Sequence, residues 1–454
     1  MNFSETAPHL IGLVRSSRSL QTEVYLTEED SRTVEWAEGK PSDTERVFGQ
    51  GMAVRVTSSG RQGLAFANRI SEEDVLSLHR KACSSAAYAC SDPCRMLPTP
   101  SSRPVRTSPR HGLFSMSVDE QQRWLSHLEK DVLKFDKRLK KIVRMGVREG
   151  RTHFAVANTR GVDVSHQDAE ASFSIELMAE QRGEVQVAWI TVSGKRLEDI
   201  PVDDVLAQVR DRALNSLGAR PLDSGEWTVL LDPWVGVEFM NLLSEALCAD
   251  AVQAGRSIFK GRIGHAVASP RVTIVDDGTL EGGISTAPVD EEGVPTQRTT
   301  LIGKGRLRGY LYDTYTARKD RVESTGNGYR AGLSAPPAPD SSNFYMIPGT
   351  TSREDLIGRT SRAFWVREVM GMHTADPVSG DFSLGASGLL VEKGKIVRAV
   401  KGVTLAGNIR GLLKNIEEVA RDLTWYGSTG CPTMRVRSLS VGGSETQRGR
   451  TDGD

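Results

Sequence analysis

A repeated alternation of apolar and polar residues is the feature that most restricts the fold of this chain. Between Ile142 and Val192 a period of two recurs in KIVRMGVREG, THFAVANTRG, ASFSIELMAEQ and VQVAWITVSG, which Gly and Asn turns separate. Successive side chains of a β-strand point to opposite faces, so this period indicates strands with one buried face. The segments therefore predict a run of antiparallel strands.

A second run of strands is predicted nearer the N-terminus. Residues 23–70 contain the segments EVYLT, RTVEWAEG and GMAVRVTSSGRQGLAFAN, and the turn pair Ser59-Gly60 stands inside the last of them. The 44 glycines among 454 residues exceed the roughly 7% that is usual, which agrees with many tight turns between strands. We expect a meander here.

Helices are predicted where a capping residue precedes apolar residues at helical spacing. Ser117 with Glu120 forms the capping-box pattern, and Asp232 followed by Pro233 combines an N-cap acid with proline at the first helical position. These patterns predict helices over 71–89, from Ser117 to about Lys141, over 202–217, and for about seventeen residues after Asp232.

Strands dominate the second half of the sequence. The segments are VTIVDD, RTTLI, RLRGYLYDTY, NFYMIPG, AFWVREVMG, GLLVEKGKIVRAVKG and TMRVRSL, with hairpin turns at Lys304-Gly305 and Lys393-Gly394. A Gly- and Pro-containing linker marks a boundary near Arg220. We expect an α+β chain: an N-terminal α/β domain of antiparallel strands backed by helices over 1–220, a mainly antiparallel β domain over 221–440, and a disordered tail over 441–454.

Charge and composition exclude several classes of partner. Lys and Arg number 58 and Asp and Glu number 58, so no overall field draws the chain to nucleic acid or to an anionic membrane. The N-terminus lacks the apolar run of a signal peptide, and no segment approaches 18 apolar residues. Five cysteines form no disulfide framework. We expect a cytoplasmic protein with no membrane contact and no direct nucleic-acid contact.

Residue patterns alone provide no complete catalytic site. His79, Cys83, Cys90 and Cys94 form a local cluster that resembles a zinc site, but the predicted helix over 71–89 favours helix packing for these side chains. The eight histidines are scattered, and none is paired at the spacing that a hydrolytic zinc site on a helix requires.

A set of Gly-rich loops in the second half carries acid, hydroxyl and basic side chains. Catalytic carboxylates are one possible use for Asp290, Glu291 and Asp381. Turn formation is the alternative, in which Asp and Asn accept hydrogen bonds from turn amides and Gly supplies a positive φ, and chemistry alone favours it. The loops are centred on Arg256-Ser257, Asp290-Glu291, Thr325-Gly326-Asn327 and Gly380-Asp381.

These segments, in this order, resemble the TldD/PmbA family, whose members were called modulators of DNA gyrase and are now grouped with metallopeptidases. The resemblance covers nearly the whole chain. It implies an N-terminal α/β domain and a C-terminal β-rich domain, as the periodicity does. The segments that carry it include GQGMAVRVTSSGRQGLAFAN, FAVANTRGVDVS, GRSIFKGRIGHAVASPRVTIVDDGTLEGG, ESTGNGYR, SGDFSLGASGLLVEKGKIVRAVKG and SLSVGG.

The peptidase branch of that family, TldD, carries an H-E-x-x-x-H zinc motif on the first helix of its second domain, and a later Cys completes the site. Here the corresponding positions hold Met240, Asn241 and Glu245, which cannot replace two imidazoles and a general base. Cys431 lies close to the place of the third ligand, but a lone thiol does not hold zinc. The resemblance therefore implies the TldE (PmbA) branch, the subunit without metal that pairs with TldD.

This resemblance implies a non-catalytic subunit of a TldD/TldE metallopeptidase that degrades or trims unfolded peptides. Zinc is expected in the TldD-like partner, and the chain alone is expected to be an inactive member of the family. Its role would be to wall a shared cavity that holds an extended peptide. A role in turns or in a dimer seam is an equally weighted alternative for the candidate residues Arg256, Ser257, Asp290, Glu291, Thr325 and Asn327.

Three other functions stay open at this point. The first is a self-sufficient homodimeric metallopeptidase that uses residues such as Glu245, Asp290 and Glu291 on a recruited metal. The second is a regulatory binding protein that acts on DNA gyrase or a toxin-antitoxin system through protein contacts, as the old family name suggests. The third is a stand-alone homodimer with another function or a lost one.

Overall fold

One long antiparallel sheet organises the N-terminal half of the chain in the computed structural model, which describes residues 3–14, 20–101 and 114–443. The strand order is β3-β2-β1-β4-β5-β6. The two predicted runs of strands are both present, although EVYLT and RTVEWAEG belong to the single strand β1. The strands are β1 (Gln21–Ala37), β2 (Lys40–Ser58), β3 (Arg61–Ala67), β4 (Leu139–Asn158), β5 (Asp163–Gln181) and β6 (Glu184–Gly194).

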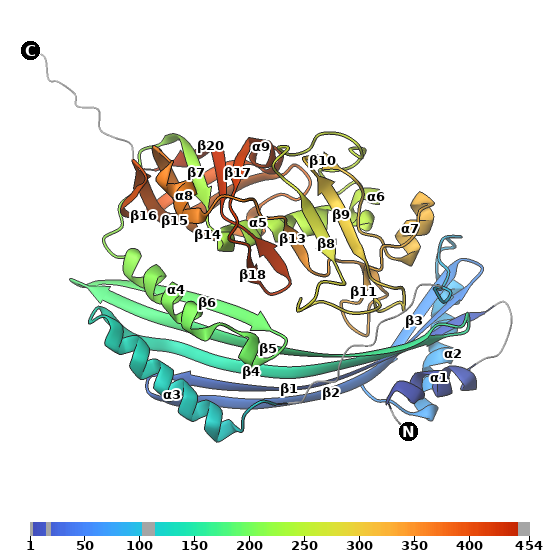
Figure 1. Ribbon diagram of the computed structural model, residues 1–454. Helices are drawn as coiled ribbons and strands as arrows, with labels where there is room; N and C mark the ends of the chain where they lie inside the picture. Colours follow the sequence, from blue (N-terminus) through green and yellow to red (C-terminus); the bar gives the residue numbers. More distant parts are fainter. Residues whose placement is uncertain (1–2, 15–19, 102–113, 444–454) are drawn as a thin grey trace, which may run out of the picture.

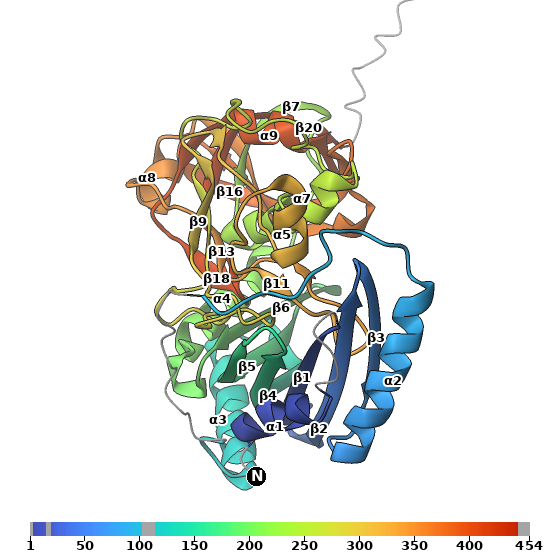
Figure 2. The ribbon, with the colours of Figure 1, turned by 90° about the vertical axis from the view of Figure 1, so that its right-hand side faces the viewer.

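Helices cover one face of this sheet (Figures 1 and 2). In β1, Val24 and Leu26 pack under α1 and α2, and Val34 packs in the cluster that contains α3 and α4. Tyr25 points to the opposite face, toward the C-terminal domain. The alternation of side chains along the strands therefore gives the sheet one face that the helices cover and one concave face. The helices are α1 (Phe3–Leu13), α2 (Glu72–Tyr88), α3 (Val118–Phe135) and α4 (Val202–Asn215), with the 3-10 turn η1 (Leu197–Asp199) before α4.

The prediction that a helix extends from Ser117 to about Lys141 was wrong at its C-terminal end. The capping box at Ser117 and Glu120 is present, but α3 ends at Phe135 because Asp136 adopts an extended conformation. The chain then enters β4 at Leu139. Lys141 is therefore a strand residue, and its ammonium lies 2.6 Å from Glu38.

The C-terminal domain contains two six-stranded sheets. Their orders are β10-β9-β8-β13-β19-β18 and β16-β15-β14-β7-β20-β17, and β16 also pairs with β20, which closes the second sheet into a barrel. The first sheet consists of β8 (Ile274–Asp277), β9 (Arg298–Gly303), β10 (Arg306–Leu307), β13 (Phe344–Met346), β18 (Thr424–Tyr426) and β19 (Thr429–Cys431). The second consists of β7 (Gly225–Leu231), β14 (Arg362–Met370), β15 (Asp381–Glu392), β16 (Lys395–Asn408), β17 (Ile416–Val419) and β20 (Met434–Gly442).

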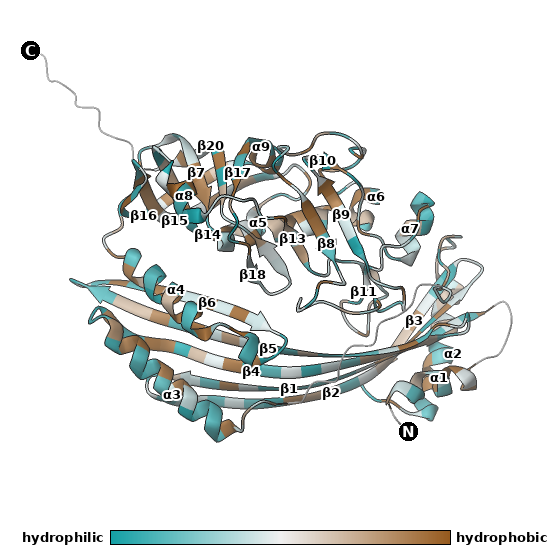
Figure 3. Cartoon of the chain, viewed as in Figure 1, coloured by the Kyte–Doolittle hydropathy of each residue, from teal (hydrophilic) through white to brown (hydrophobic). Residues whose placement is uncertain are grey.

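Short elements complete this domain, and the α+β class is confirmed. The predicted strand RLRGYLYDTY is mostly loop, because β10 ends at Leu307 and Asp313 caps a helix instead. In Figure 3, β8 and β9 are hydrophobic over part of their length, whereas α7 is mostly hydrophilic. These elements are α5 (Pro233–Ala246), α6 (Ala249–Gln253), α7 (Thr314–Asp320), α8 (Arg353–Gly358), α9 (Ile409–Asn415), β11 (Gly328–Tyr329), β12 (Ala338–Pro339) and η2 (Met372–Thr374).

The C-terminal domain lies against the concave face of the long sheet (Figure 1). Tyr25, Ala53 and Val156 of the sheet form an apolar cluster there, with Leu333 of the C-terminal domain packed against it. Of the predicted tail over 441–454, Val441 and Gly442 belong to β20, and 444–454 lie outside the described residues. No helix in the described ranges has the length and apolar character needed to cross a membrane.

Candidate functional site

Helix α5 begins at a strong N-cap and presents one open side. The carboxylate of Asp232 accepts the Trp234 N–H at 3.2 Å, and Pro233 occupies the first helical position. The helix has 14 residues, and α6 follows after a break at Leu247 and Cys248 instead of a single helix of about seventeen residues. Most of its side chains are buried, but Trp234, Glu238, Asn241 and Glu245 are partly or fully exposed at helical spacing.

The three residues that the sequence resemblance matches to the zinc motif do not form a metal site. Met240 is 1% exposed and packs in the domain core, whereas Asn241 and Glu245 face outward. The Asn241 side-chain oxygen accepts the Thr429 hydroxyl at 2.7 Å. A buried thioether, an engaged amide and one carboxylate do not match the N and S donors that hold zinc in proteins. The residues present therefore do not fit zinc.

Cys431 packs against the same helix. A Cβ atom added to Gly236 would lie 2.6 Å from its Sγ atom, so the helix approaches the thiol closely. Burial raises the pKa of the Cys431 thiol well above its usual value, which disfavours the thiolate that a metal needs. Across the described ranges, no three His, Cys, Asp or Glu side chains are grouped to hold a metal ion, and the cluster at Cys83, Cys90 and Cys94 is included in that statement.

Asp290 organises a loop between the domains. Its side chain is fully buried and accepts the backbone N–H groups of Glu292 at 3.0 Å, Val294 at 2.9 Å and Gly328 at 2.8 Å. Burial and the neighbouring Glu292 raise the pKa of Asp290 well above its usual value. These contacts place Asp290 in turn formation, and they bring its loop against the loop that contains Gly328.

Thr325 and Asn327 hold the neighbouring loop. The Thr325 hydroxyl accepts the Tyr312 N–H at 2.8 Å and donates to the Tyr312 carbonyl at 3.1 Å. The Asn327 amide nitrogen donates to the Asp276 carboxylate at 2.8 Å and to the Asp340 carbonyl at 2.9 Å. Both side chains thus bond to nearby backbone or buried groups of their own domain.

Arg256 and Ser257 lie elsewhere in the C-terminal domain, after α6. The buried Ser257 hydroxyl accepts the Phe259 N–H at 3.0 Å and donates to the Ala246 carbonyl at 2.5 Å, which joins the loop to the end of α5. Arg256 is exposed. The predicted set therefore consists of two adjacent loops, at 290–291 and 325–327, and a separate turn.

Glu291 is the predicted residue that touches both domains. Its two carboxylate oxygens accept the Tyr25 hydroxyl at 2.8 Å and the Arg330 N–H at 2.6 Å. Burial raises the pKa of Glu291, although both hydrogen bonds lower it. Glu291 also lines an interdomain cavity.

A buried ionic network beside Glu291 was not predicted. Arg55 of β2 contacts Glu23 of β1 at 2.5 Å and Glu292 of the C-terminal domain at 3.1 Å, and Arg330 also pairs with Glu23. Burial alone would raise the pKa of Glu23, but Arg55 and Arg330 lower it. Charged residues at otherwise apolar strand positions, such as Arg55 in AVRVTS, were the signal available in the sequence.

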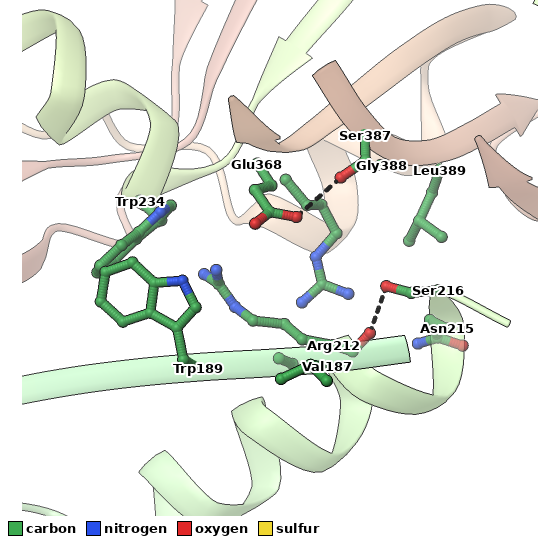
Figure 4. A pocket seen from close by; sticks show the side chains of 12 residues that line it. Val187, Trp189, Arg212, Asn215, Ser216, Trp234, Glu368, Ser387, Gly388 and Leu389 are labelled. Atoms are coloured by element: carbon green, nitrogen blue, oxygen red, sulfur yellow. Dashed lines mark hydrogen bonds between the residues drawn. The ribbon is translucent and has the colours of Figure 1, made fainter. Parts of the chain in front are cut away.

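An aromatic seam of Trp189, Trp234 and Tyr426 joins the domains at the N-terminus of α5, and Figure 4 shows Trp189 and Trp234. The Trp189 and Trp234 rings meet edge to face with centroids 4.8 Å apart, and Tyr426 lies 4.7 Å from the other side of Trp234. A small pocket beside the seam is also lined by Arg212, whose guanidinium lies 3.0 Å from Asp232. Sequence reasoning missed this seam, although Trp189 stood at an alternating position of a predicted strand.

Family models match the chain in three consecutive parts. The PmbA/TldA metallopeptidase domain 1 matches residues 22–86, the central domain matches residues 112–217, and the C-terminal domain matches residues 224–443. Together they cover both halves of the long sheet and the whole β-rich domain.

Known relatives agree with these matches. Metalloprotease MJ0996 of Methanocaldococcus jannaschii is 27% identical, over 87% of this chain and 88% of its own. A metalloprotease TldD homolog of Haemophilus influenzae is 34% identical, over 51% of this chain and 52% of its own. The crystal structure of TldE from Thermococcus kodakarensis has a TM-score of 0.87 and 22% identity, and covers 97% of this chain and 99% of its own, which shows a shared fold.

Proposed function

The chain belongs to the PmbA/TldA metallopeptidases, the TldD/PmbA family, and from this premise we propose that it is the subunit without zinc of a cytoplasmic TldD/TldE-type peptidase. The observation that carries this proposal is the chemistry of α5. The resemblance matches Met240, Asn241 and Glu245 to the first zinc ligand, the general base and the second zinc ligand of the peptidase branch, and Met240 is buried in the core. Such a helix neither binds zinc nor activates water.

The open side of α5 supports a role in holding substrate. Glu238, Asn241 and Glu245 offer two carboxylates and an amide along one side of the helix, whose N-terminal Trp234 packs in the aromatic seam. Two strands also offer unpaired edges: β6 is the last strand of its sheet, and β2 pairs with β3 only from Met52 onward. Strand edges bind main chain irrespective of side chains, which suits unfolded peptides.

Reconstitution tests this proposal. The chain, a TldD-like subunit with an intact H-E-x-x-x-H helix, and their mixture are each assayed for zinc and for hydrolysis of an unfolded peptide. We expect no stoichiometric zinc and no hydrolysis from the chain alone, a stable complex with the partner, and faster hydrolysis by the complex than by the partner alone.

A partner variant with the motif Glu replaced by Gln is the matched control. It should form the same complex and hydrolyse nothing, which assigns the chemistry to the partner. Stoichiometric zinc and chelator-sensitive hydrolysis by the purified chain would overturn the proposal. Failure of the two chains to associate would also overturn it.

A further inference from the structure

A cavity of about 420 Å³ lies between the concave face of the long sheet and the C-terminal domain. Its floor is formed by β4 and β5, including Phe154, His166 and Glu170, and its roof includes Glu291 and Tyr329. This volume falls in the range of small-molecule and peptide sites, whereas a single water occupies about 30 Å³. The cavity is therefore large enough for part of a peptide.

The basic side chains in the cavity wall are already paired. Arg148 lies 2.7 Å from Glu29, and Arg151 lies 3.6 Å from Glu28. Lys195 is not one of the lining residues, but it lies 2.6 Å from Asp168 of the wall and donates to the Ile284 carbonyl in the roof.

Two carboxylates on opposite walls have no such partner. Among the described residues, Glu170 and Glu291 form no ion pair with a basic side chain, although both line the cavity. Glu291 accepts hydrogen bonds from the Tyr25 hydroxyl and the Arg330 backbone N–H, and the charge of Arg330 also lowers its pKa, so its negative charge is compensated only in part. A cation between the two walls would therefore gain electrostatic energy from both.

Two buried polar atoms beside the cavity are unpartnered among the described residues. They are Nε2 of His166 and the hydroxyl of Tyr329. Burial lowers the pKa of His166, which favours the neutral ring, and a neutral imidazole has one acceptor nitrogen. The Tyr329 hydroxyl also has acceptor capacity. The side chain of Phe154, which meets the His166 ring at a centroid distance of 5.8 Å, adds an aromatic surface suited to a cation.

We propose that this cavity binds a primary ammonium group at the end of an extended chain, either the free amino terminus of a peptide or a lysine side chain. An ammonium group has three donors and one positive charge, which suit carboxylates that form no ion pair. The His166 and Tyr329 side chains line the cavity, and their unpartnered polar atoms, which are closed to solvent in the free chain, would have to turn toward a bound ammonium to accept from it. An anion would meet the excess of carboxylates. The choice of a peptide as carrier rests on the proposed function.

Calorimetric titration of the purified full chain tests this proposal with three peptides. The first is tetra-alanine amide with a free amino terminus, the second is the same peptide with an acetylated amino terminus, and the third is an acetylated peptide that ends in lysine amide. We expect the free amino terminus to bind at least about tenfold more tightly than the acetylated peptide, as for a lost charge-assisted hydrogen bond. Recovery by the third peptide alone assigns the site to lysine side chains.

Variants distinguish binding in the cavity from a general effect of the charge of the chain. Glu170→Gln removes an exposed carboxylate of the rim, and Tyr329→Phe removes a hydroxyl that holds no hydrogen bond in the fold. Each should weaken binding of the free amine several-fold, and Tyr329→Phe should not lower the melting temperature. Glu45→Gln, an exposed carboxylate on β2 outside the cavity, is the matched control and should leave binding unchanged.

Two outcomes would overturn the proposal. One is the absence of measurable binding of either amine to the unmodified chain, and the other is binding of the acetylated tetra-alanine that is as tight as the binding of both peptides with a free amine. Both measurements use the chain without its partner. If the chain binds no amine but forms an active complex with its partner, only this site is rejected. If the chain binds the amine but forms no complex, only the proposed function is rejected.

Discussion

At the scale of single residues, the buried carboxyl groups fall into two kinds. Glu23 is surrounded by two guanidinium groups, and its pKa is lowered in spite of burial. Asp276 and Asp313 accept hydrogen bonds only from neutral groups, and burial raises the pKa of each to about 6. Ionised carboxyl groups of the first kind stabilise the folded state, whereas ionisation of the second kind destabilises it.

Asp313→Asn should make the stability of the chain less dependent on pH. The pKa of Asp313 is about 6 in the folded chain against an ordinary 3.8, so between these values the folded state holds more protons than the unfolded state. The free energy of unfolding therefore falls as pH rises through this window, by at most about 3 kcal/mol, and nothing is lost below it. Asn keeps the cap on Thr316 but has no charge to bury.

Urea unfolding from pH 4 to pH 7 measures this difference. The free energy of unfolding of the variant should increase steadily relative to that of the unmodified chain as the pH rises. Most of this increase should be present by pH 7. Two parallel curves of stability against pH would show that Asp313 does not titrate in this window.

Thr325→Val should destabilise the C-terminal domain by about 1–3 kcal/mol, because it leaves the Tyr312 N–H without its side-chain acceptor. Thr299→Val is the matched control, since the buried Thr299 hydroxyl has no hydrogen-bond partner in the part of the chain that the structure describes and its loss should be neutral. Chemical denaturation of both variants measures the effect. A stable Thr325→Val chain that loses peptide turnover with its partner would instead assign Thr325 to substrate contact.

Local chemistry predicted some of these roles and not others. The preference for Asp and Asn in turns anticipated Asp290, because its contacts lie within a few residues and at one adjacent loop. The pair of Arg55 and Glu292 is separated by 237 positions, and only the docking of two domains brings them together. No local pattern carries that information.

At the scale of elements, periodicity located strands well where one face is buried along their whole length. The hairpin turns at Lys304-Gly305 and Lys393-Gly394 are confirmed by positive φ at all four residues. The prediction from periodicity was wrong where the alternating pattern continued beyond the end of a strand. Strand-like residues after Arg306 form a loop and a cap, because Asp313 has the side chain to start α7 there.

Gly63→Ala should separate α2 from β3. A Cβ atom at this position would lie 2.0 Å from the Ala82 carbonyl oxygen, which is helix backbone and cannot move without the whole helix. Overpacking of this kind costs about 1–3 kcal/mol or more. Gly49→Ala in β2 is the control, because nothing lies within 4 Å of its added Cβ. Thermal unfolding that is equal for the two variants would contradict this account of the close approach.

At the scale of the whole molecule, the contacts that join the domains include ionic, aromatic and apolar groups of residues. The ionic network of Glu23, Arg55, Glu292 and Arg330 is buried, the aromatic seam at α5 is partly exposed, and the apolar cluster around Tyr25 lies between sheet and loop. The sequence predicted two domains and their classes. It did not predict how the two domains contact each other. Each contact pairs residues of different domains, and the sequence pattern of each domain describes only that domain.

Arg55→Met should weaken the contact between the domains by more than the loss of the packed arginine side chain alone would. It leaves Glu23 with one cation and Glu292 with none, and breaking a buried pair in this way costs about 3–5 kcal/mol. The deficit should shrink on acidification, because protonation removes the unpaired charge. The double variant with Glu292→Gln should be more stable than Arg55→Met alone, since the charge at position 292 is gone while Arg330 still pairs with Glu23. Denaturant unfolding of the single and double variants at pH 5 and pH 7 measures both effects. If the double variant were less stable than the single at both values, Arg55 would contribute through its packed side chain, and the domains would be held together by the apolar and aromatic contacts instead.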